Sequence, residues 1–141
     1  MGYTRSSNIW RAVIAFLRAS SVDTSMTGGF HRGPAPEKTK YPLCLINPVV
    51  TPYEDDFGAD TRMIVGVVDI TVYSRNSVEA DELDGSIADT LEGADLTVDG
   101  QTVLVVRRIS DLILDPEVDA EGMKVYPFGG TYEVWTDQSR T

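Results

Sequence analysis

Residues 62–93 read RMIVGVVDITVYSRNSVEADELDGSIADTLEG, and two clean periodicities lie side by side in this stretch. From Arg62 to Ser74 the apolar side chains fall on both faces of an extended chain, which predicts a long strand. From Ser77 to Leu91 the apolar residues recur at helical spacing, at Ala80, Leu83, Ile87 and Leu91. The stretch therefore predicts a strand, a short turn, and a helix that begins at a cap formed by Asn76 or Ser77.

The predicted strand is apolar on both of its faces. One face carries Ile64, Val68, Ile70 and Val72, and the other carries Met63, Val65, Val67, Thr71 and Tyr73. A strand with two apolar faces is usually covered on both sides, so we expect a helix on one side and another subunit on the other. Gly66 interrupts the apolar run and predicts a bulge or a close approach of backbone.

The N-terminal part supplies another helix and another strand. Apolar residues at helical spacing predict a helix from Ser6 or Ser7 to Ala19, with either serine as its cap. A strand is predicted at Tyr41–Ile46, and Asn47-Pro48 is expected to end it. Between these elements, residues 21–40 hold several glycines and prolines and show no periodicity, which predicts a long loop.

The C-terminal part predicts a hairpin and a last strand. Asp99-Gly100 suits a type I′ turn, because both central positions of that turn need φ > 0. The strand after it is expected to run from Gln101 to about Ile109. The last strand is predicted at Lys124–Thr136, broken or kinked at Gly129-Gly130, and Asp137–Thr141 is expected to form a polar tail.

These elements together predict an α+β fold. Their order is α-β-β-α-β-β, and the simplest packing is a mainly antiparallel four-stranded sheet with two helices on one face. The length of 141 residues suits a single domain spanning 1–141. The uncovered face or an edge strand then needs cover, and oligomerisation is a plausible source.

The charge of the chain limits its partners. The formal net charge is −10, with 12 Lys and Arg against 22 Asp and Glu. Scattered cations do not grip a phosphate backbone, although an acidic surface lets DNA pass without sticking. Acids that are mostly Asp, with few Lys, suit a very salty cytoplasm. We expect no membrane span and no secretory signal, because the apolar runs are only a few residues long.

Catalytic and metal-binding patterns are missing from the sequence. With Cys44 and His31 as the only residues of their types, no intrachain disulfide and few triads or zinc sites are possible. Paired carboxylates are inevitable by chance among so many acids, so they indicate little. The acids between residues 54 and 60 fit no EF-hand spacing and suit solvated turns better. We therefore expect no catalytic residue, no cofactor and no metal.

The order of the elements resembles the tail-terminator (tail-completion) proteins of long-tailed viruses. The resemblance rests on the early helix, the Gly/Pro loop and Tyr41-Pro42-Leu43, and then on the strand that ends VDITVYS at 68–74 with the helix after it. A hairpin leading into Arg107-Arg108 follows, and TYEVW at 131–135 occupies the place of the family's closing strand. The long 21–40 loop and the heavy Asp content depart from the family pattern, which leaves the binding surfaces open.

The resemblance implies a structural role in the virion. Such proteins are made in the host cytoplasm and form a ring, commonly a hexamer, on the head-proximal end of the tail tube. The partners implied are further copies of the chain, the tail tube protein and a head-completion or stopper protein. DNA passes through the lumen without specific binding, and no membrane is involved.

The family carries no catalytic residue over to this chain. As subunit contacts we predict the loop residues Phe30 and Arg32 and the acidic connection with Asp115, Glu117 and Asp119. Two alternatives stay open at this stage. One is another ring component of the neck or tail, such as a stopper or tube protein, and the other is a small carboxylate-dependent enzyme or ligand-binding domain.

Overall fold

The computed structural model describes residues 6–36, 38–56, 61–94, 96–98 and 101–139. Within these ranges the chain forms, in order, α1 (Ser6–Arg18), α2 (Val22–Ser25), β1 (Phe30–His31), β2 (Leu43–Asp56), β3 (Thr61–Ser74), α3 (Ser77–Leu91), β4 (Thr97–Val98), β5 (Gln101–Leu112), β6 (Glu117–Val118) and β7 (Lys124–Ser139). The strands build one sheet in the order β1-β2-β3-β7-β5-β4, with β6 paired to β7. β1 is parallel to β2, and the other pairs are antiparallel.

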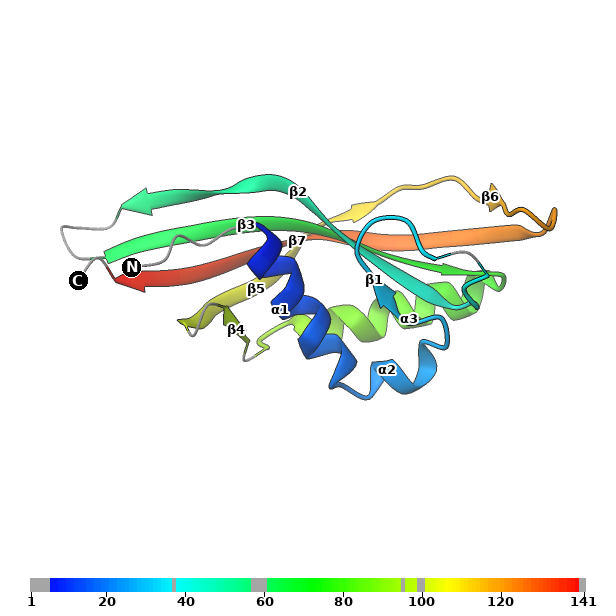
Figure 1. The fold of residues 1–141 in the computed structure, drawn as a ribbon, viewed down its shortest axis with the longest axis horizontal. Coiled ribbons are helices and arrows are strands. Elements are labelled where there is room, and N and C mark those ends of the chain that lie inside the picture. Colours follow the sequence, from blue (N-terminus) through cyan, green and yellow to red (C-terminus); the bar gives the residue numbers. More distant parts are fainter. Residues whose placement is uncertain (1–5, 37, 57–60, 95, 99–100, 140–141) are drawn as a thin grey trace.

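The α+β class and the order of the long elements are confirmed. Figure 1 shows α1 and α3 on one face of the sheet, and strands β2, β3 and β7 extending beyond the helices at one end. The prediction of four strands was incomplete, because the described sheet also contains the short strands β1, β4 and β6. These have two residues each, too few to show a periodicity in the sequence.

The stretch from β3 to α3 folds as its periodicities predict. Asn76 caps α3, because its Oδ1 accepts hydrogen bonds from the backbone N–H of Val78 (2.9 Å) and Glu79 (3.1 Å). Gly93 lies just past the end of α3 with φ +70°, a conformation that glycine adopts without steric cost. The predicted stripe of Ala80, Leu83, Ile87 and Leu91 is buried.

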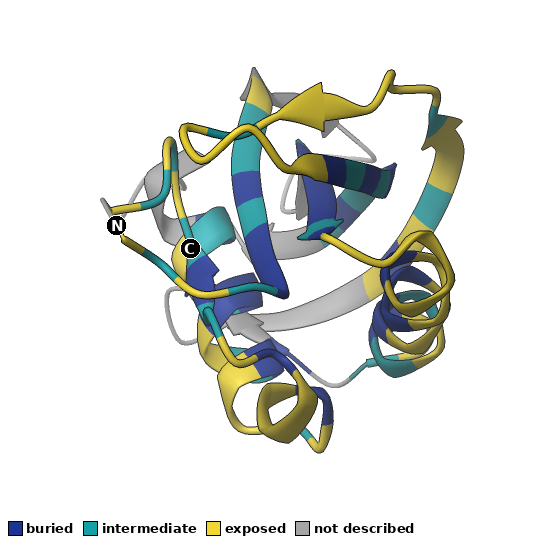
Figure 2. Cartoon of the chain, turned by 90° about the vertical axis from the view of Figure 1, so that its right-hand side faces the viewer, coloured by how far each residue is buried: buried dark blue, intermediate teal, exposed yellow. Residues whose placement is uncertain are grey.

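The core lies between the helices and the sheet. The stripe of α3 and the apolar face of α1 pack on β2, β3 and β7, where the buried side chains include Cys44, Ile46, Val68, Ile70, Val72, Tyr132 and Val134. Figure 2 shows dark buried residues between the two layers and exposed outer helix faces. Helices of 13 and 15 residues are marginal alone, so this packing supplies most of their stability.

The face of β3 opposite the helices, which carries Asp69 and Tyr73, is partly covered by residues of the same chain. Near Tyr73 that face is lined by Leu43 and Leu45 of β2 and is flanked by two segments, residues 34–41 and 117–125. Farther along, Thr131 Oγ1 donates a 2.7 Å hydrogen bond to Asp69 on the same face. An additional subunit over this face stays a prediction.

At Gly66, α1 approaches the sheet closely, which is one of the two predicted alternatives. A Cβ at this position would lie 2.3 Å from Cδ1 of Ile9 on α1, so the missing side chain lets α1 sit directly on the sheet. The adjacent pairing of β2 with β3 is irregular, with register shifts between Pro48 and Tyr53. The bulge alternative is therefore also found, on the partner strand.

Two predicted strand ends were wrong. Asn47-Pro48 does not end β2, which continues to Asp56. β1 covers only Cys44 and Leu45, so Pro48 stands on an edge strand beside a register shift, where a missing N–H is tolerated. β7 runs on to Ser139 beside β3, so most of the predicted polar tail is strand.

The predicted 21–40 loop was also wrong in part. It contains α2 and β1, and Phe30 on β1 pairs with Cys44. The sequence pattern could not reveal a two-residue parallel pairing, because that pairing depends on a strand more than ten residues away. The hairpin is confirmed by the pairing of β4 with β5, although its turn at 99–100 lies outside the described residues.

Gly129-Gly130 does not break β7. The β3–β7 register passes through both glycines without a shift, so Phe128, Tyr132 and Val134 share the helix-covered face. The glycines have a packing role instead. A Cβ on Gly129 would lie 2.4 Å from the backbone oxygen of Ile70, and one on Gly130 would lie 2.4 Å from Nε of Arg108.

We predict that Gly129→Ala lowers the free energy of unfolding by about 1–3 kcal/mol, because the added methyl group meets backbone that cannot move aside. Gly85→Ala is the matched control. Gly85 lies within α3, and a methyl group added there would meet no atom within 4 Å, so this change raises stability by about 0.5–1 kcal/mol. Urea unfolding measures both, and equal effects of the two changes would contradict the packing role.

Candidate assembly surfaces

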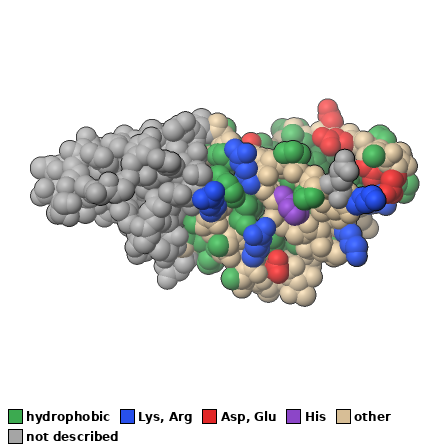
Figure 3. All heavy atoms as spheres, viewed as in Figure 1, with side chains coloured by type: hydrophobic (Ala, Val, Ile, Leu, Met, Phe, Trp, Pro, Cys, Tyr) green, Lys and Arg blue, Asp and Glu red, His purple; other side chains and the backbone are tan. Residues whose placement is uncertain are grey.

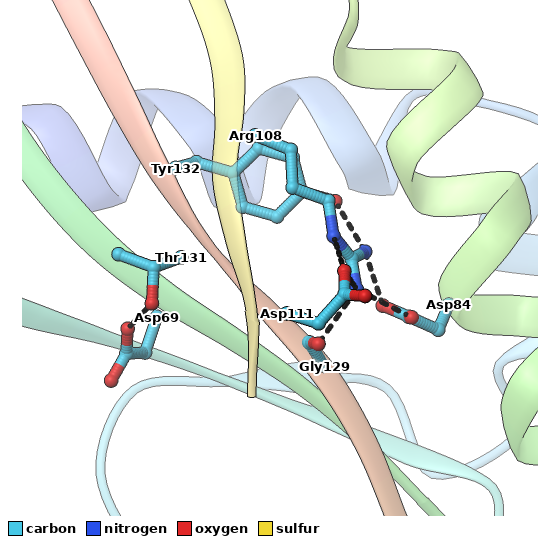
Figure 4. A network of polar contacts seen from close by, with 7 residues as sticks. All are labelled: Asp69, Asp84, Arg108, Asp111, Gly129, Thr131 and Tyr132. Carbon is cyan, nitrogen blue, oxygen red and sulfur yellow. Dashed lines mark hydrogen bonds and ion pairs between the residues drawn. The ribbon is translucent and has the colours of Figure 1, made fainter. Parts of the chain in front are cut away.

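A partly buried arginine joins α3 to the sheet. Arg108 on β5 makes a bidentate pair with Asp84 on α3, with both N–O distances 2.9 Å (Figure 4). It also donates to Gly129 O (2.7 Å), to the Tyr132 hydroxyl (3.2 Å) and to Asp111 Oδ1 (2.9 Å). All five N–H donors of the guanidinium are thereby used. This group holds the layers together and has no donor left for a ligand.

The same contacts explain the proton affinities around Arg108. The hydrogen bonds to Asp84 raise the pKa of the arginine above its already high ordinary value. Burial raises the pKa of Tyr132 to about 12, although the neighbouring guanidinium opposes that shift. Both groups keep one charge state across the physiological range, as structural groups do.

Sequence reasoning missed Asp84. A signal was present, because Asp84 follows Ala80 by four residues and precedes Ile87 by three, which places a carboxylate on the apolar stripe of α3. Its partner Arg108 is 24 residues away, so the sequence does not indicate the pairing. The acids on the outer face of this helix and at its C-cap are exposed; they are Asp81, Glu82, Asp89 and Glu92.

A second arginine anchors the acidic connection. Arg75 Nη2 lies 2.8 Å from Asp119 Oδ2 and 2.9 Å from Glu121 Oε2, and its guanidinium stacks 5.2 Å from the ring centre of Tyr41. Asp119 Oδ1 accepts the backbone N–H of Glu121 (2.9 Å) and of Met123 (3.0 Å). Asp119, which was predicted to contact a neighbouring subunit, thus closes a turn of its own chain.

These hydrogen bonds favour the charged form of Asp119. The backbone N–H of Met123 makes the largest contribution, Arg75 adds to it, and together they hold the pKa of Asp119 below its ordinary value of 3.8. The carboxylate is therefore ionised wherever the fold is intact near neutral pH.

An exposed segment lies between β5 and β6. We call residues 113–117 the presenting segment; it contains Ile113, Leu114, Asp115, Pro116 and Glu117. Every one of them is exposed, and Ile113 is 98% exposed. Pairing of Leu112 with Gly129 fixes one end, and pairing of Glu117 with Val125 fixes the other. Two neighbouring apolar side chains, Ile113 and Leu114, are thus held at the surface between paired strands.

A groove with several cations lies between α1 and the residues that follow β1. We call it the arginine groove; it is lined by Trp10, Arg11, Ile14, Ala15, Arg18, His31, Arg32, Pro34 and Pro36. Arg11 and Arg32 stack on the Trp10 ring, 5.3 Å and 5.9 Å from its centre. In Figure 3, Lys and Arg side chains gather around the histidine in the middle of this view, and acids gather at the β6 end.

Backbone contacts hold the groove in shape. Arg18 Nη2 donates a 2.7 Å hydrogen bond to Phe30 O, and His31 Nε2 donates a 2.6 Å hydrogen bond to Gly28 O. The backbone N–H of Gly33 donates to Asn47 Oδ1 at 2.8 Å, which ties the loop to β2. These contacts place Arg32, one of the predicted contact residues, at the surface.

Phe30 lies in the core, although we predicted it as a contact with a neighbouring subunit. Its side chain is 0% exposed and belongs to the core, so it supports β1 from inside and is not on the surface to meet a neighbour. The glycines around it suggested an exposed loop tip, whereas β1 pairing turns the ring inward. Asp115 and Glu117 lie at the surface in the presenting segment, where their role as contacts stays a prediction.

Reactive groups are few in the part of the chain that the structure describes. Cys44 is fully buried, and burial raises the pKa of its thiol well above the usual range. Within the described ranges, no three or more His, Cys, Asp and Glu side chains gather closely enough for one metal ion. The acids at 54–60 lie outside the described side chains. No helix in these ranges has the length and apolar composition needed to cross a membrane.

The described part of the chain is an α+β protein with exposed surfaces and a tightly paired ion network between its layers. Comparison with known proteins identifies the group. Residues 11–120 match the family described as "Tail completion protein gp17". The chain belongs to this family, and it is therefore a structural protein of the virion, located in the tail or neck.

Two solved structures are similar to the chain. A chain of the "Virion of native gene transfer agent (GTA) particle" is 16% identical, with a TM-score of 0.64 over 97% of this chain and 100% of that chain. The gp17 protein of bacteriophage SPP1 is 18% identical, with a TM-score of 0.53 over 96% and 91% of the two chains. At these identities the likeness shows a shared fold. No curated protein matches the chain.

We predict that Arg108→Met lowers the free energy of unfolding by about 3 kcal/mol, because Asp84 is left buried without its partner. The double variant Arg108→Met/Asp84→Leu recovers most of that loss, since both charges are gone. Arg107→Met is the control. Its pair with Glu133 has a 60% exposed arginine side chain, so its loss costs under about 1 kcal/mol. Urea unfolding tests the set, and equal losses at Arg107 and Arg108 would refute it.

We predict that Asp119 contributes stability that depends on pH. Because its folded pKa lies below 3.8, the contribution is fully present above the unfolded pKa and is lost as the pH falls through the folded value. Carboxyl NMR titration checks this. In Arg75→Ala the midpoint of Asp119 rises only in part, because the hydrogen bond from Met123 remains. A complete return to 3.8 would show that Arg75 alone lowers the pKa.

Proposed function

We propose that this chain is a tail terminator, which forms a ring on the head-proximal end of the tail tube. The observation that carries the proposal is the match to the tail completion family over residues 11–120. In this role the ring, taken as a hexamer, stops growth of the tube and joins it to a head-completion or stopper protein. The chain acts through its surfaces and has no catalytic role.

Charge supports the proposal. A net charge of −10 disfavours a grip on the phosphates of DNA that moves through a lumen. The described arginines Arg75, Arg107 and Arg108 are engaged with carboxylates, which leaves them unfit to bind a phosphate backbone. A source in a very salty cytoplasm, suggested by the Asp-rich composition, stays a prediction.

Exposed surfaces on opposite edges of the sheet also support a ring. The arginine groove lies beside β1 and β2, and the presenting segment continues from β5. Contacts that join different surfaces of identical subunits generate rings when the rotation closes. A monomer would gain nothing from exposing Ile113 and Leu114 to water.

A second candidate is another ring component of the neck or tail, such as a stopper or tube protein. The similar chain of the gene transfer agent particle favours keeping it, because that title names a virion and no position within it. The two roles differ in one measurable property. A terminator binds the end of a tube once, whereas a tube protein adds along its length.

We predict that the purified chain forms a hexamer by native mass spectrometry and caps one end of tubes in negative-stain images. Added during polymerisation of tube protein from the same virus, it shortens the tubes in proportion to its concentration. A stopper would leave tube length unchanged, and a tube protein would lengthen the tubes. A chain that is monomeric at low and at molar salt, and that does not bind tubes, would count against every ring role.

A further inference from the structure

The arginine groove and the presenting segment are opposite in chemical character. The groove presents Arg11, Arg18 and Arg32 around Trp10, and no carboxylate is found among the described residues that line it. The segment presents Asp115 and Glu117 next to apolar side chains. In a chain with a net charge of −10, a surface of this positive character is unusual and calls for an acidic partner.

We propose that the arginine groove of one subunit binds the presenting segment of a second copy of the same chain. Asp115 and Glu117 pair with Arg11 and Arg32, while Ile113 and Leu114 pack against the neighbouring prolines and the part of Trp10 that the arginines leave open. The proposal rests on the ring proposed above and names the two surfaces that join its subunits.

Sheet register places the two surfaces at one level. His31 pairs with Leu45, Leu45 with Thr71, Thr71 with Gly129, and Gly129 with Leu112, so these five residues form a row across the sheet. The row spans four strand spacings, about 19 Å. Arg32 of the groove follows one end of the row, and Ile113 of the segment follows the other. Copies placed side by side therefore bring groove and segment together.

The segment begins on the helix-covered side of the sheet and ends on the other face. The groove is built on α1, and Ile113 and Leu114 share a hollow with Asp81 and Asp84 of α3, whereas Glu117 lines a pocket with Leu43 and Tyr73 on the opposite face. A neighbour can therefore reach Ile113 and Leu114 from the helix-covered side. The contact joins unlike surfaces, so each subunit donates one segment and receives another, which is the arrangement that closes a ring.

Both surfaces are ordered before they meet. Strand pairing holds the segment at both ends, and stacking of Arg11 and Arg32 holds Trp10 in the groove. Ordering in advance reduces the entropy lost on binding. Trp and Arg are also the residue types that contribute most to binding energy at interfaces, whereas the exposed Ile113 supplies the apolar contact.

Charge reversal tests the proposal. The groove variant is Arg11→Glu/Arg32→Glu, and the segment variant is Asp115→Arg/Glu117→Arg; all four side chains are exposed, so circular dichroism is expected to match that of the parent chain. Each variant alone loses at least about 100-fold in association constant and stays monomeric at concentrations where the parent forms rings. The control Asp89→Lys/Glu92→Lys, at exposed residues of α3 and its C-cap that line neither surface, keeps the ring.

Mixing the two variants gives the sharpest result. In a 1:1 mixture the normal segment of the groove variant meets the normal groove of the segment variant, and the reversed groove meets the reversed segment. The mixture therefore forms rings in which the two variants alternate. The chain that carries all four reversals pairs its swapped charges and forms rings again. Native mass spectrometry resolves each of these species.

The outcomes separate this inference from the proposed function. Rings that persist in both variants, or a mixture that fails to assemble, overturn the pairing and leave the ring itself intact. Loss of duplex DNA binding by the groove variant, with its rings unchanged, would assign the groove to DNA instead. A parent chain that never assembles, alone or on tubes, overturns both proposals.

Discussion

The guanidinium of Arg108 is the contact that fixes where α3 lies on the apolar face of the sheet. Its hydrogen bonds reach α3 through Asp84, and they reach β7 through Gly129 and Tyr132. A planar group with five donors suits this position, because lysine has neither the reach nor the geometry for a bidentate pair. Gly130 leaves the space in which the side chain lies. The position of α3, the glycines of β7 and the arginine at residue 108 therefore depend on one another.

Strand pairing across the sheet sets the distance between its two edges. The row from His31 to Leu112 crosses β1, β2, β3, β7 and β5, so the groove at one end and the segment at the other keep a constant separation. Arg75 adds a second anchor by holding the turn at Asp119. A subunit of a closed ring needs such constancy, because an error in the angle at each contact accumulates around the ring. In the proposed ring, the edges of the sheet make the contacts between subunits, and the interior of each subunit sets the distance between those edges.

The similarity to the two solved structures fits this view. Identities of 16% and 18% accompany coverage of nearly the whole chain, so the fold is shared while most side chains differ. Surface chemistry can diverge freely on a common scaffold as long as each surface and its partner change together. Subunits of one ring carry both partners on the same chain, so compensating changes arise within one sequence. Residue-level contacts are therefore expected to be particular to each member.

The sequence by itself determined the long elements, the choice of Asn76 or Ser77 as the cap of α3 and the buried stripe of α3, because these depend on residues within a few positions of one another. The family also followed from the order of those elements. Only the tertiary structure decided the length of β2 past Pro48, the pairing of Asp84 with Arg108 and the burial of Phe30. Each depends on which distant strand or helix lies alongside, and no local pattern records that neighbour. The same reason explains why Asp119 turned out to hold a turn in its own chain, and why the arginine groove, assembled from α1 and the segment after β1, was not visible in the sequence.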